Sequence, residues 1–334
     1  MKRWHYPFLA FLIIGTIIIL SQSKPAKAEY RTAQGLVFGT RYNVTYLYNT
    51  DLQPDIEQTL ALVDSALSMF NPESTISAVN AAESIQVTDT MFLKVYRRAM
   101  EISRLTDGAF DITVAPAVNA WGFGFKHAEN ISRSTIDSLL EITGYTKIHE
   151  RDGLITKDDA RIMLDCSAIA KGFGSDMVAD MFRSKGINDF MVEIGGEIVV
   201  SGHNPKGKLW NIGISKPVDD SLSVNNELQT VIPVTDIAMA TSGNYRNFYV
   251  KDGRKYAHTI DPHTCTPVSH SLLSVTVFAQ DCATADALAT SMMVMGLDSA
   301  QALCSRHPEI EAYFIFEGAE GEMETTSTSG SLFQ

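Results

Sequence analysis

Cysteine is scarce in this sequence: only Cys166, Cys265, Cys282 and Cys304 occur among 334 residues. They form no CxxC pair and no metal-ligand spacing, and their separations suggest no small disulfide framework, which leaves one or two disulfides open for an oxidising compartment. The signatures HExxH and GxSxG are also missing, so zinc-protease and serine-hydrolase chemistry have no support. No internal repeat is visible, and a repeat architecture is therefore not indicated.

Basic residues are few as well. The chain has 27 Lys and Arg against 39 Asp and Glu, a formal net charge of −12, and four of the basic residues but no acid lie within residues 1–28. The rest of the chain therefore carries a formal charge of −16. This acidic body argues against nucleic acid and anionic membrane surfaces as partners. An anionic substrate would have to be met by local cations, backbone N–H groups or a metal ion.

Residues 1–28 have the pattern of an export signal: a basic start, the apolar run Phe8–Leu20, and the small-residue pattern AKA at the end. The run is shorter than the ~20 apolar residues of a transmembrane helix. We therefore expect an exported, periplasmic protein that is cleaved after Ala28, with an uncleaved anchor at the inner membrane as the alternative. No cysteine stands near the end of this segment, so a lipid anchor has no attachment point.

The remaining sequence predicts an α+β fold with mostly antiparallel pairing, built as one large domain or two intimate ones over residues 29–316. Helical spacing predicts helices after Pro54, from Asp89, up to Gly144, from about Ile169 to Lys185, and over 281–296. Short β-like runs predict strands at YTKIHE, ARIMLD, DFMVEI, WNIGIS, TVIPVTD and IEAYFIF. NFYVKDGRKYAHT predicts a hairpin, and the loop 217–228 and the polar tail 317–334 predict mobile surface.

The stretch DCATADALATSMMVMG places Asp286 and Thr290 four residues apart on one face of a helix of small and apolar residues. For an isolated pair, local hydrogen bonding is the simpler interpretation. The apolar neighbours, however, indicate a buried helix, and a buried carboxylate needs a cation or several donors. Together with phosphate oxygens, this pair would suit a hard cation such as Mg²⁺.

Two glycine-containing stretches could bring backbone close to an anion. In LDCSAIAKGFGSD, a strand is predicted to end at Asp165, and small residues lead into a helix with Lys171 in its first turns, where an anion could be neutralised. A tight junction with a solvated lysine explains the stretch equally well. In VEIGGEIVVSG, Gly195 and Gly196 allow either close approach of a ligand or a plain hairpin turn.

Two further stretches contain aromatic or titratable candidates. His258 follows a predicted hairpin arm and precedes Asp261-Pro262, where it would be a structural hydrogen-bonding residue or, beside a phosphate, a base or phosphate contact. LTDGAFDITVAPAVNAWGFG contains Gly108 as a candidate helix C-cap and aromatic residues that would fill a core or wall a flat heterocycle.

Taken together and in order, these stretches resemble the ApbE family of flavin transferases. The resemblance runs through VFGTRYNVTY, FNPESTISAVN, DGAFDITVAP, LDCSAIAKGFGSD, EIGGEI, ATSGNYRNF, HTIDPHTCTP and ATADALATSMMVMG, and it covers nearly the whole body after residue 28. It implies an α+β body of two subdomains with FAD in the cleft between them. It also implies an enzyme that binds FAD, uses Mg²⁺ on the pyrophosphate, transfers FMN to a Thr or Ser hydroxyl of an acceptor flavoprotein, and releases AMP.

The resemblance also implies roles for particular residues. Asp286 and Thr290 would bind the metal together with Ala168, through its carbonyl, and Asp286 and His258 are the candidate catalytic residues. Contacts to FAD are implied for the following residues: Phe38, Phe70, Ala109, Phe110, Asp111, Asp165, Lys171, Glu193, Gly195, Gly196 and His258. Two other functions fit the same residues: an FAD pyrophosphatase in which water replaces the acceptor, and an exported flavin-binding protein without activity.

The sequence departs from the family's usual pattern in four places. Phe38 stands where the family commonly has Met, Phe70 where it often has Tyr, and Cys265 where it has the glycine of a DP-x-TG turn. Many members also carry a lipid-anchoring cysteine, which this chain lacks. These departures predict altered contacts to the flavin or adenine ring, and an unusual backbone conformation at Cys265.

Overall fold

The computed structural model describes Phe11, residues 28–124, 131–217, 227–244, 248–251 and 254–328, and Leu332. The predicted export signal, most of the loop at 217–228 and the KDG turn lie outside these residues. In the described part of the chain, no helix combines the length and the apolar character needed to cross a membrane.

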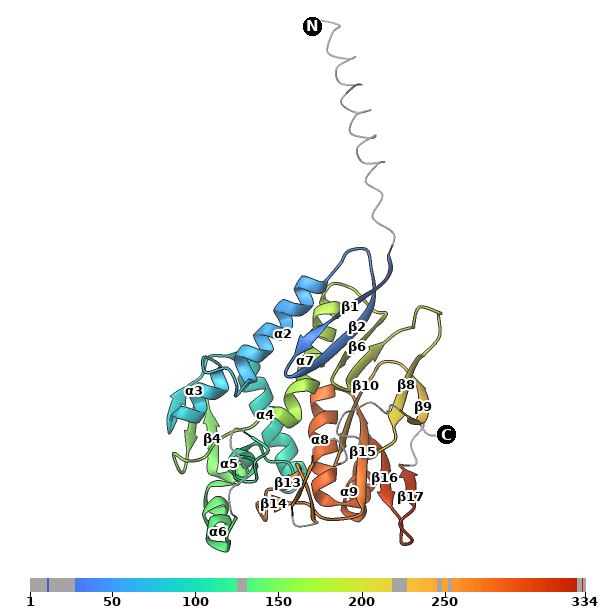
Figure 1. Ribbon diagram of the computed structural model, residues 1–334. Helices are drawn as coiled ribbons and strands as arrows, with labels where there is room; N and C mark the ends of the chain where they lie inside the picture. Colours follow the sequence, from blue (N-terminus) through green and yellow to red (C-terminus); the bar gives the residue numbers. More distant parts are fainter. Residues whose placement is uncertain are drawn as a thin grey trace, which may run out of the picture.

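An eight-stranded antiparallel sheet organises the fold (Figure 1). Its strands, in spatial order, are β1 (Glu29–Val37), β2 (Thr40–Tyr48), β6 (Phe190–Ile194), β7 (Glu197–Ser201), β10 (Ile237–Gly243), β15 (Leu272–Ala279), β16 (Glu311–Glu317) and β17 (Met323–Ser327). Every neighbouring pair is antiparallel. The predicted α+β class with mostly antiparallel pairing is confirmed.

A different layer covers each face of this sheet. Helices α7 (Ser167–Ser184) and α8 (Cys282–Met295) pack on one face, against a core that includes Val275 and Val277 of β15. On the other face, the hairpin of β8 (Trp210–Ser215) and β9 (Leu228–Val234) packs against Phe278. Because neighbouring residues of a strand point to opposite faces, β15 is buried on both sides.

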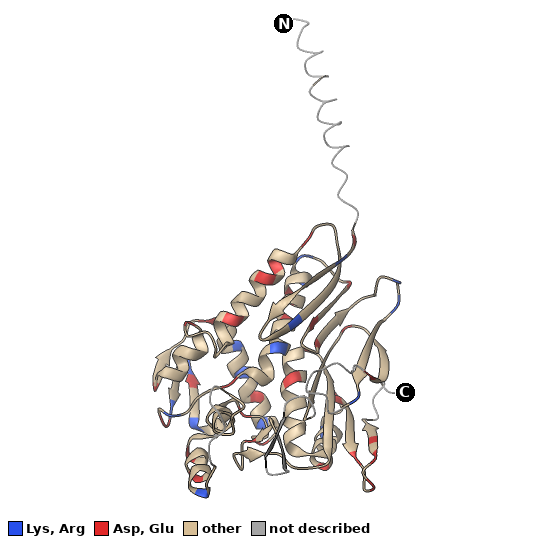
Figure 2. Ribbon diagram, in the orientation of Figure 1, with Lys and Arg blue, Asp and Glu red and all other residues tan. Residues whose placement is uncertain are grey.

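The predicted helices are present. They are α2 (Gln53–Leu67), α4 (Thr90–Leu105), α6 (Arg133–Ile142), α7 and α8, and the shorter α3 (Thr75–Ala81), α5 (Ala115–Ala120) and α9 (Leu297–Arg306) accompany them. The start of α4 is fixed by Asp89, whose carboxylate accepts hydrogen bonds from the backbone N–H groups of Met91 and Phe92. Acidic residues form red bands along α2 and are spread over the molecule, consistent with the acidic charge of the body (Figure 2).

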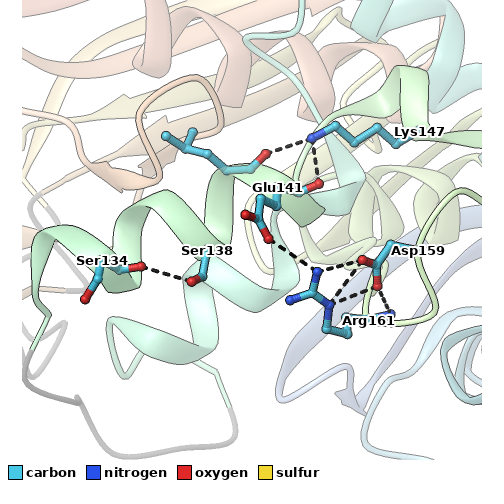
Figure 3. A network of polar contacts seen from close by, with 7 residues as sticks. Ser134, Ser138, Glu141, Lys147, Asp159 and Arg161 are labelled. Atoms are coloured by element: carbon cyan, nitrogen blue, oxygen red, sulfur yellow. Dashed lines mark hydrogen bonds and ion pairs between the residues drawn. The ribbon is translucent and has the colours of Figure 1, made fainter.

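A smaller three-stranded sheet lies beside α3 and α6. Its spatial order is β3 (Ser84–Gln86), β5 (Leu154–Lys157) and β4 (Ile148–Arg151). The Lys147 ammonium donates to the carbonyls of Leu140 at 2.7 Å and Glu141 at 2.8 Å, which caps the last turn of α6 (Figure 3). Arg161 pairs with Asp159 and, at 3.4 Å, with Glu141, so α6 is attached to the segment that follows β5.

Two short hairpins complete the described chain. β11 (Phe248–Lys251) pairs with β12 (Arg254–Ala257), as the alternating pattern predicts. β13 (Ile260–Asp261) pairs with β14 (Thr266–Pro267). The second hairpin carries the turn that holds Cys265.

Three expectations need correction. The run ARIMLD is not a strand: it begins in a turn, and the Asn80 side chain then donates to the Leu164 carbonyl and accepts from its N–H, taking the place of a partner strand. Phe70 does not continue the buried stripe of α2, because the helix ends at Leu67 and Phe70 is 78% exposed. Part of the expected mobile tail is β17, the edge strand of the large sheet.

Candidate functional site

A cavity of about 470 Å³ lies against α7 and α8. Its walls come from the segment after α2, the 109–118 segment, the first turns of α7, the start of β7, the end of β10, residues 258–262 and one face of α8. These residues are up to 225 positions apart in the chain, from Met69 to Val294, and the fold alone brings them together. The sequence-predicted residues that line it are Phe70, Ala109, Phe110, Asp111, Asp165, Ala168, Lys171, Gly195, His258, Asp286 and Thr290.

A buried cluster of three charges lies in the wall of this cavity. The Lys171 ammonium is 3.3 Å from Glu197 Oε1 and 3.9 Å from Asp286 Oδ2. Burial raises the pKa of both carboxyl groups, and Lys171 partly opposes that rise. For Lys171 itself, burial lowers the pKa, but Asp286 and Glu197 more than offset it, so the pKa lies above its ordinary value and the ammonium stays charged.

A close crossing of α7 and α8 sets the spacing within this cluster. A Cβ atom at Gly172 would overlap the carbonyl of Cys282, so only glycine allows the two helices to approach this far. The Gly172 N–H consequently reaches Asp286 Oδ2 at 3.1 Å. One turn further along α7, the Asp176 carboxylate accepts from the N–H groups of Cys282 at 2.8 Å and Ala283 at 2.9 Å. Asp176 thus joins α7 to the first turn of α8.

The oxygen donors on α8 fit a hard divalent cation. Both contacts to Asp286 fall on Oδ2, which leaves Oδ1 able to bind a cation. One turn later, the Thr290 hydroxyl faces the same cavity and lies 3.0 Å from the Ser242 hydroxyl of β10. Ala168 adds backbone to the same wall. Within the described ranges, no group of three or more His, Cys, Asp or Glu could hold a metal, so a cation here would also need oxygens from a bound phosphate.

Two other carboxylates in the wall are used within the protein. Asp111 accepts hydrogen bonds from Thr113 through Oδ1 and from the Tyr145 N–H through Oδ2. Asp165 accepts from the Ser167 N–H at 2.7 Å, ahead of the first turns of α7. Burial raises the pKa of Asp111 and of Asp165, and the hydrogen bonds partly oppose this. These contacts hold the two loops in place beside the cavity.

His258 lies in the wall of the cavity, next to Phe123. Their rings meet edge to face, with centroids 6.4 Å apart. The expected neighbour Asp261 contacts a different histidine: its carboxylate accepts from the His263 N–H and lies 3.1 Å from His263 Nδ1. His263 Nε2 in turn lies 2.9 Å from the Asp107 carbonyl, which ties the 261–265 turn to the loop after α4.

Three residues for which a contact to FAD was expected lie outside the cavity wall. The Phe38 side chain packs against the position of Gly174 and against Ile194, between two core clusters. Glu193 accepts a hydrogen bond from Asn43 across the β2–β6 pair. Gly196 occupies the turn between β6 and β7 with φ of 107°. Of the double glycine, only Gly195 lines the cavity.

Sequence analysis missed two residues of the site, Glu197 and Ser242. Both belong to stretches that it singled out, VEIGGEIVVSG and TSGNYRNF. Glu197 is 4% exposed although it is charged, and charged residues are rarely buried unless they are paired. A glutamate at the first position of a strand, directly after two glycines, was the available signal, but its partner Lys171 lies on another element.

Cys265 adopts the left-handed conformation that the family's glycine would adopt, with φ of 50°. Its thiol is fully buried and lies 3.6 Å from the Thr143 hydroxyl. Its carbonyl accepts a hydrogen bond from the Trp121 indole at 2.8 Å. All four cysteines are buried and free, so the disulfides left open by the sequence do not form in this structure.

Comparison with protein families gives a match to the ApbE family over residues 38–314. Among curated proteins, an FAD:protein FMN transferase of Vibrio cholerae is 35% identical over 100% of this chain and 99% of the relative. The FAD:protein FMN transferase of Haemophilus influenzae is 31% identical over 95% of this chain and 96% of the relative.

Solved structures agree with this match. The flavin transferase ApbE from Vibrio cholerae superposes with a TM-score of 0.81 at 36% identity, covering 90% of this chain and 98% of that protein. The apo form of the Pseudomonas stutzeri flavinyl transferase ApbE has the same TM-score at 30% identity, covering 90% and 95%.

Proposed function

This chain belongs to the ApbE family, and we propose that it is an FAD:protein FMN transferase that uses Mg²⁺, links FMN through a phosphoester bond to a Thr or Ser hydroxyl of an acceptor flavoprotein, and releases AMP. The transferase activity rests on curated relatives that match it over nearly their whole length. The metal, the bond and the leaving group are inferred from the chemistry of the cavity.

One observation carries the proposal: a half-buried lysine and a carboxylate–hydroxyl pair share the wall of a single cavity in an otherwise acidic protein. Lys171 provides the local cation that an anionic substrate needs. Asp286 and Thr290 provide hard oxygen donors, and Asp286, Thr290 and Ala168 would hold the metal. When bound, Mg²⁺ would neutralise charge on the pyrophosphate.

The transfer of FMN forms one P–O bond and breaks another, so it needs no further reactant. The acceptor hydroxyl oxygen attacks the phosphorus on the riboflavin side, and the bond from that phosphorus to the bridging oxygen breaks, so that AMP leaves in line with the attack. The hydroxyl proton must go to a base. His258 is our candidate to accept it or to orient the phosphate, because it lines the same cavity. Lys171 stabilises charge on the phosphate oxygens during the transfer.

Loops of the cavity wall would hold the two ring systems of FAD. Phe70 and Phe110 are aromatic residues of this wall, and Ala109 and Gly195 provide backbone that a ligand can approach closely. Phe38, Glu193 and Gly196, which lie outside the wall, would act on the ligand only by supporting the residues that touch it.

We further propose that the protein is exported to the periplasm, on the basis of the signal-like pattern of residues 1–28, and that its acceptor is an exported flavoprotein. The domain would then comprise residues 29–316, with the N-terminal segment removed or retained as a membrane anchor. Mass spectrometry of the protein from a periplasmic fraction would distinguish a chain that starts at Glu29 from one that starts at Met1.

One experiment tests the activity. The body from residue 29 is incubated with FAD, Mg²⁺ and a flavoprotein domain that carries a candidate threonine, and AMP and the acceptor mass are measured together. Release of AMP with an FMN-sized increase in acceptor mass supports the transferase. Release of AMP without an adduct would indicate a pyrophosphatase, and FAD retention without either product would indicate a flavin-binding protein.

A further inference from the structure

The partner of Lys171 on β7 has no assigned role, and its environment is unusual. Glu197 is 4% exposed, and its Oε1 atom lies 3.3 Å from the Lys171 ammonium. Its other oxygen, Oε2, is buried with no hydrogen-bond partner among the described residues. Leaving a buried acceptor unsatisfied is destabilising, and more so for a charged group. A role that needs this carboxylate would account for its being kept.

The position of Glu197 is fixed from both sides. Its strand is paired to β6 and β10, and its own backbone carbonyl accepts a hydrogen bond from the Ser175 hydroxyl of α7 at 3.0 Å. Ser175 is one turn from Lys171 on the same helix. The backbone of Glu197 is therefore held at a fixed distance from the Lys171 backbone. The long lysine side chain is the flexible member of the pair, so its ammonium is the group that can move.

Lys171 has two carboxylates within reach, and it lies closer to Glu197 than to Asp286, at 3.3 Å against 3.9 Å. The difference matters, because Asp286 is the carboxylate that would bind the metal. An ammonium in full contact with Asp286 would compete with a cation for the same charge. We infer that Glu197 is a positioning residue that holds the Lys171 ammonium away from Asp286, which keeps Asp286 available for a divalent cation.

When Glu197 loses its charge, the Lys171 ammonium is released towards Asp286, where it competes with a cation for the carboxylate. The cluster also loses one negative charge, which lowers its attraction for a cation directly. This direct part is the smaller one, and it is the only part that remains in a protein without the lysine. The affinity for a divalent cation should therefore fall on the order of tenfold in Glu197→Gln, which corresponds to about 1.4 kcal/mol.

The inference rests on the proposed function, and direct cation binding tests it separately from activity. Mn²⁺ serves as the probe, and free Mn²⁺ is measured by electron paramagnetic resonance in the presence of FAD and without acceptor. Glu197→Gln should bind Mn²⁺ about tenfold more weakly than the parent protein. Glu197→Asp keeps the charge and should recover most of the affinity. Glu150→Gln is the matched control, since Glu150 is another largely buried carboxylate paired to a cation, Arg97, at 2.8 Å.

A double-mutant cycle with Lys171→Met asks whether Glu197 acts through the lysine. Without the ammonium there is no competitor, so Glu197→Gln should change the Mn²⁺ affinity by less than about threefold in this background. An equal loss in both backgrounds would overturn the positioning role, because Glu197 would then attract the cation directly. Circular dichroism establishes that each variant is folded.

The outcomes separate the inference from the proposed function. If the parent protein binds Mn²⁺ and releases AMP while Glu197→Gln binds Mn²⁺ equally well, the positioning role is wrong and the transferase assignment stands. If the parent protein neither binds Mn²⁺ nor releases AMP with an acceptor present, both are wrong. The inference is supported if Glu197→Gln binds Mn²⁺ more weakly than the parent protein and Glu197→Asp recovers the affinity. In the Lys171→Met background, Glu197→Gln should then have little further effect on Mn²⁺ affinity.

Discussion

The contact between Asp176 and α8 predicts an unusual pH dependence of stability, which Asp176→Asn should remove. The Asp176 carboxylate accepts from two N–H groups at the start of the helix that carries Asp286. Burial raises the pKa of Asp176 from 3.8 to about 7; the two N–H donors oppose the rise, and the nearby charges of Asp281 and Asp180 add to it. A carboxyl group with a raised pKa binds its proton more tightly in the folded state than in the unfolded state.

The direction of the effect follows from proton linkage. Between pH 4 and pH 7 the folded protein holds a proton on Asp176 that the unfolded chain has lost, so stability falls as the pH rises across this window. A shift of about three units corresponds to about 4 kcal/mol at 1.36 kcal/mol per unit. Asp176 keeps part of its surface accessible to solvent, so screening reduces this, and we expect on the order of 2 kcal/mol.

The asparagine side chain does not titrate, but its single carbonyl oxygen can replace only one of the two carboxylate oxygens that accept hydrogen bonds from α8. Asp176→Asn should therefore lose about 1 kcal/mol of stability at pH 5, from a weakened hydrogen bond. At pH 8 it should equal or exceed the parent protein, because no charge is buried.

Urea unfolding at pH 5 and pH 8, followed by circular dichroism, measures the free energy of unfolding for both proteins. The parent-minus-variant difference should fall by about 2 kcal/mol from pH 5 to pH 8. A difference that stays constant within about 0.5 kcal/mol would refute the reasoning. Asp137→Asn, an exposed carboxylate of α6 that does not act on Asp176, controls for the removal of a charge.

Three further outcomes can be measured with simple assays. Asp286→Asn should lower Mg²⁺-dependent AMP release by at least about 100-fold. In the parent protein only, a chelator should abolish turnover and added Mg²⁺ should restore it. Full turnover in the variant would exclude Asp286 as a metal ligand. Ser242→Ala removes the hydroxyl 3.0 Å from Thr290 and should raise the half-saturating Mg²⁺ concentration by about two- to tenfold, with turnover preserved at saturation; an unchanged Mg²⁺ dependence would contradict this. The free energy of unfolding in urea should be about 1 kcal/mol lower for Cys265→Ala than for Cys265→Gly. Both variants lose the buried thiol, but the φ of 50° at this position is unfavourable for alanine and not for glycine. Equal free energies of unfolding would show that the conformation carries no strain.

Helices and strands with a clear period of apolar residues were predictable from the sequence, and elements buried on both sides were not. The stripe of Ile56, Leu60 and Val63 predicts α2 because only one face of that helix is buried. In contrast, the alternation of LLSVTVFA does not mark an exposed face: Ser274 and Thr276 are buried like their apolar neighbours, since β15 lies between a helical layer and a hairpin. ARIMLD has the composition of a strand, but the Asn80 side chain takes up hydrogen bonds that a strand partner would make.

The candidate site was predictable where its residues follow one another on a helix. Asp286 and Thr290 are four positions apart, so their common face follows from helical geometry alone. Glu197 and Lys171 form their pair across a strand and a helix, and the spacing of neither residue reveals the other. Phe38 shows what a family motif leaves open: its partly buried ring packs against Gly174 and does not line the cavity.

The cavity is built from two kinds of structure, and this has a consequence for how the protein could be altered. The cluster of Lys171, Glu197 and Asp286 lies on α7, β7 and α8, which pack within the central layers. The aromatic part of the wall comes from connecting segments around Phe70 and Phe110. Exchange of these loops would change the shape offered to a ring while the charges keep their spacing. Under the proposed function, loop exchange is therefore the change to try first for attaching flavin analogues that retain the pyrophosphate.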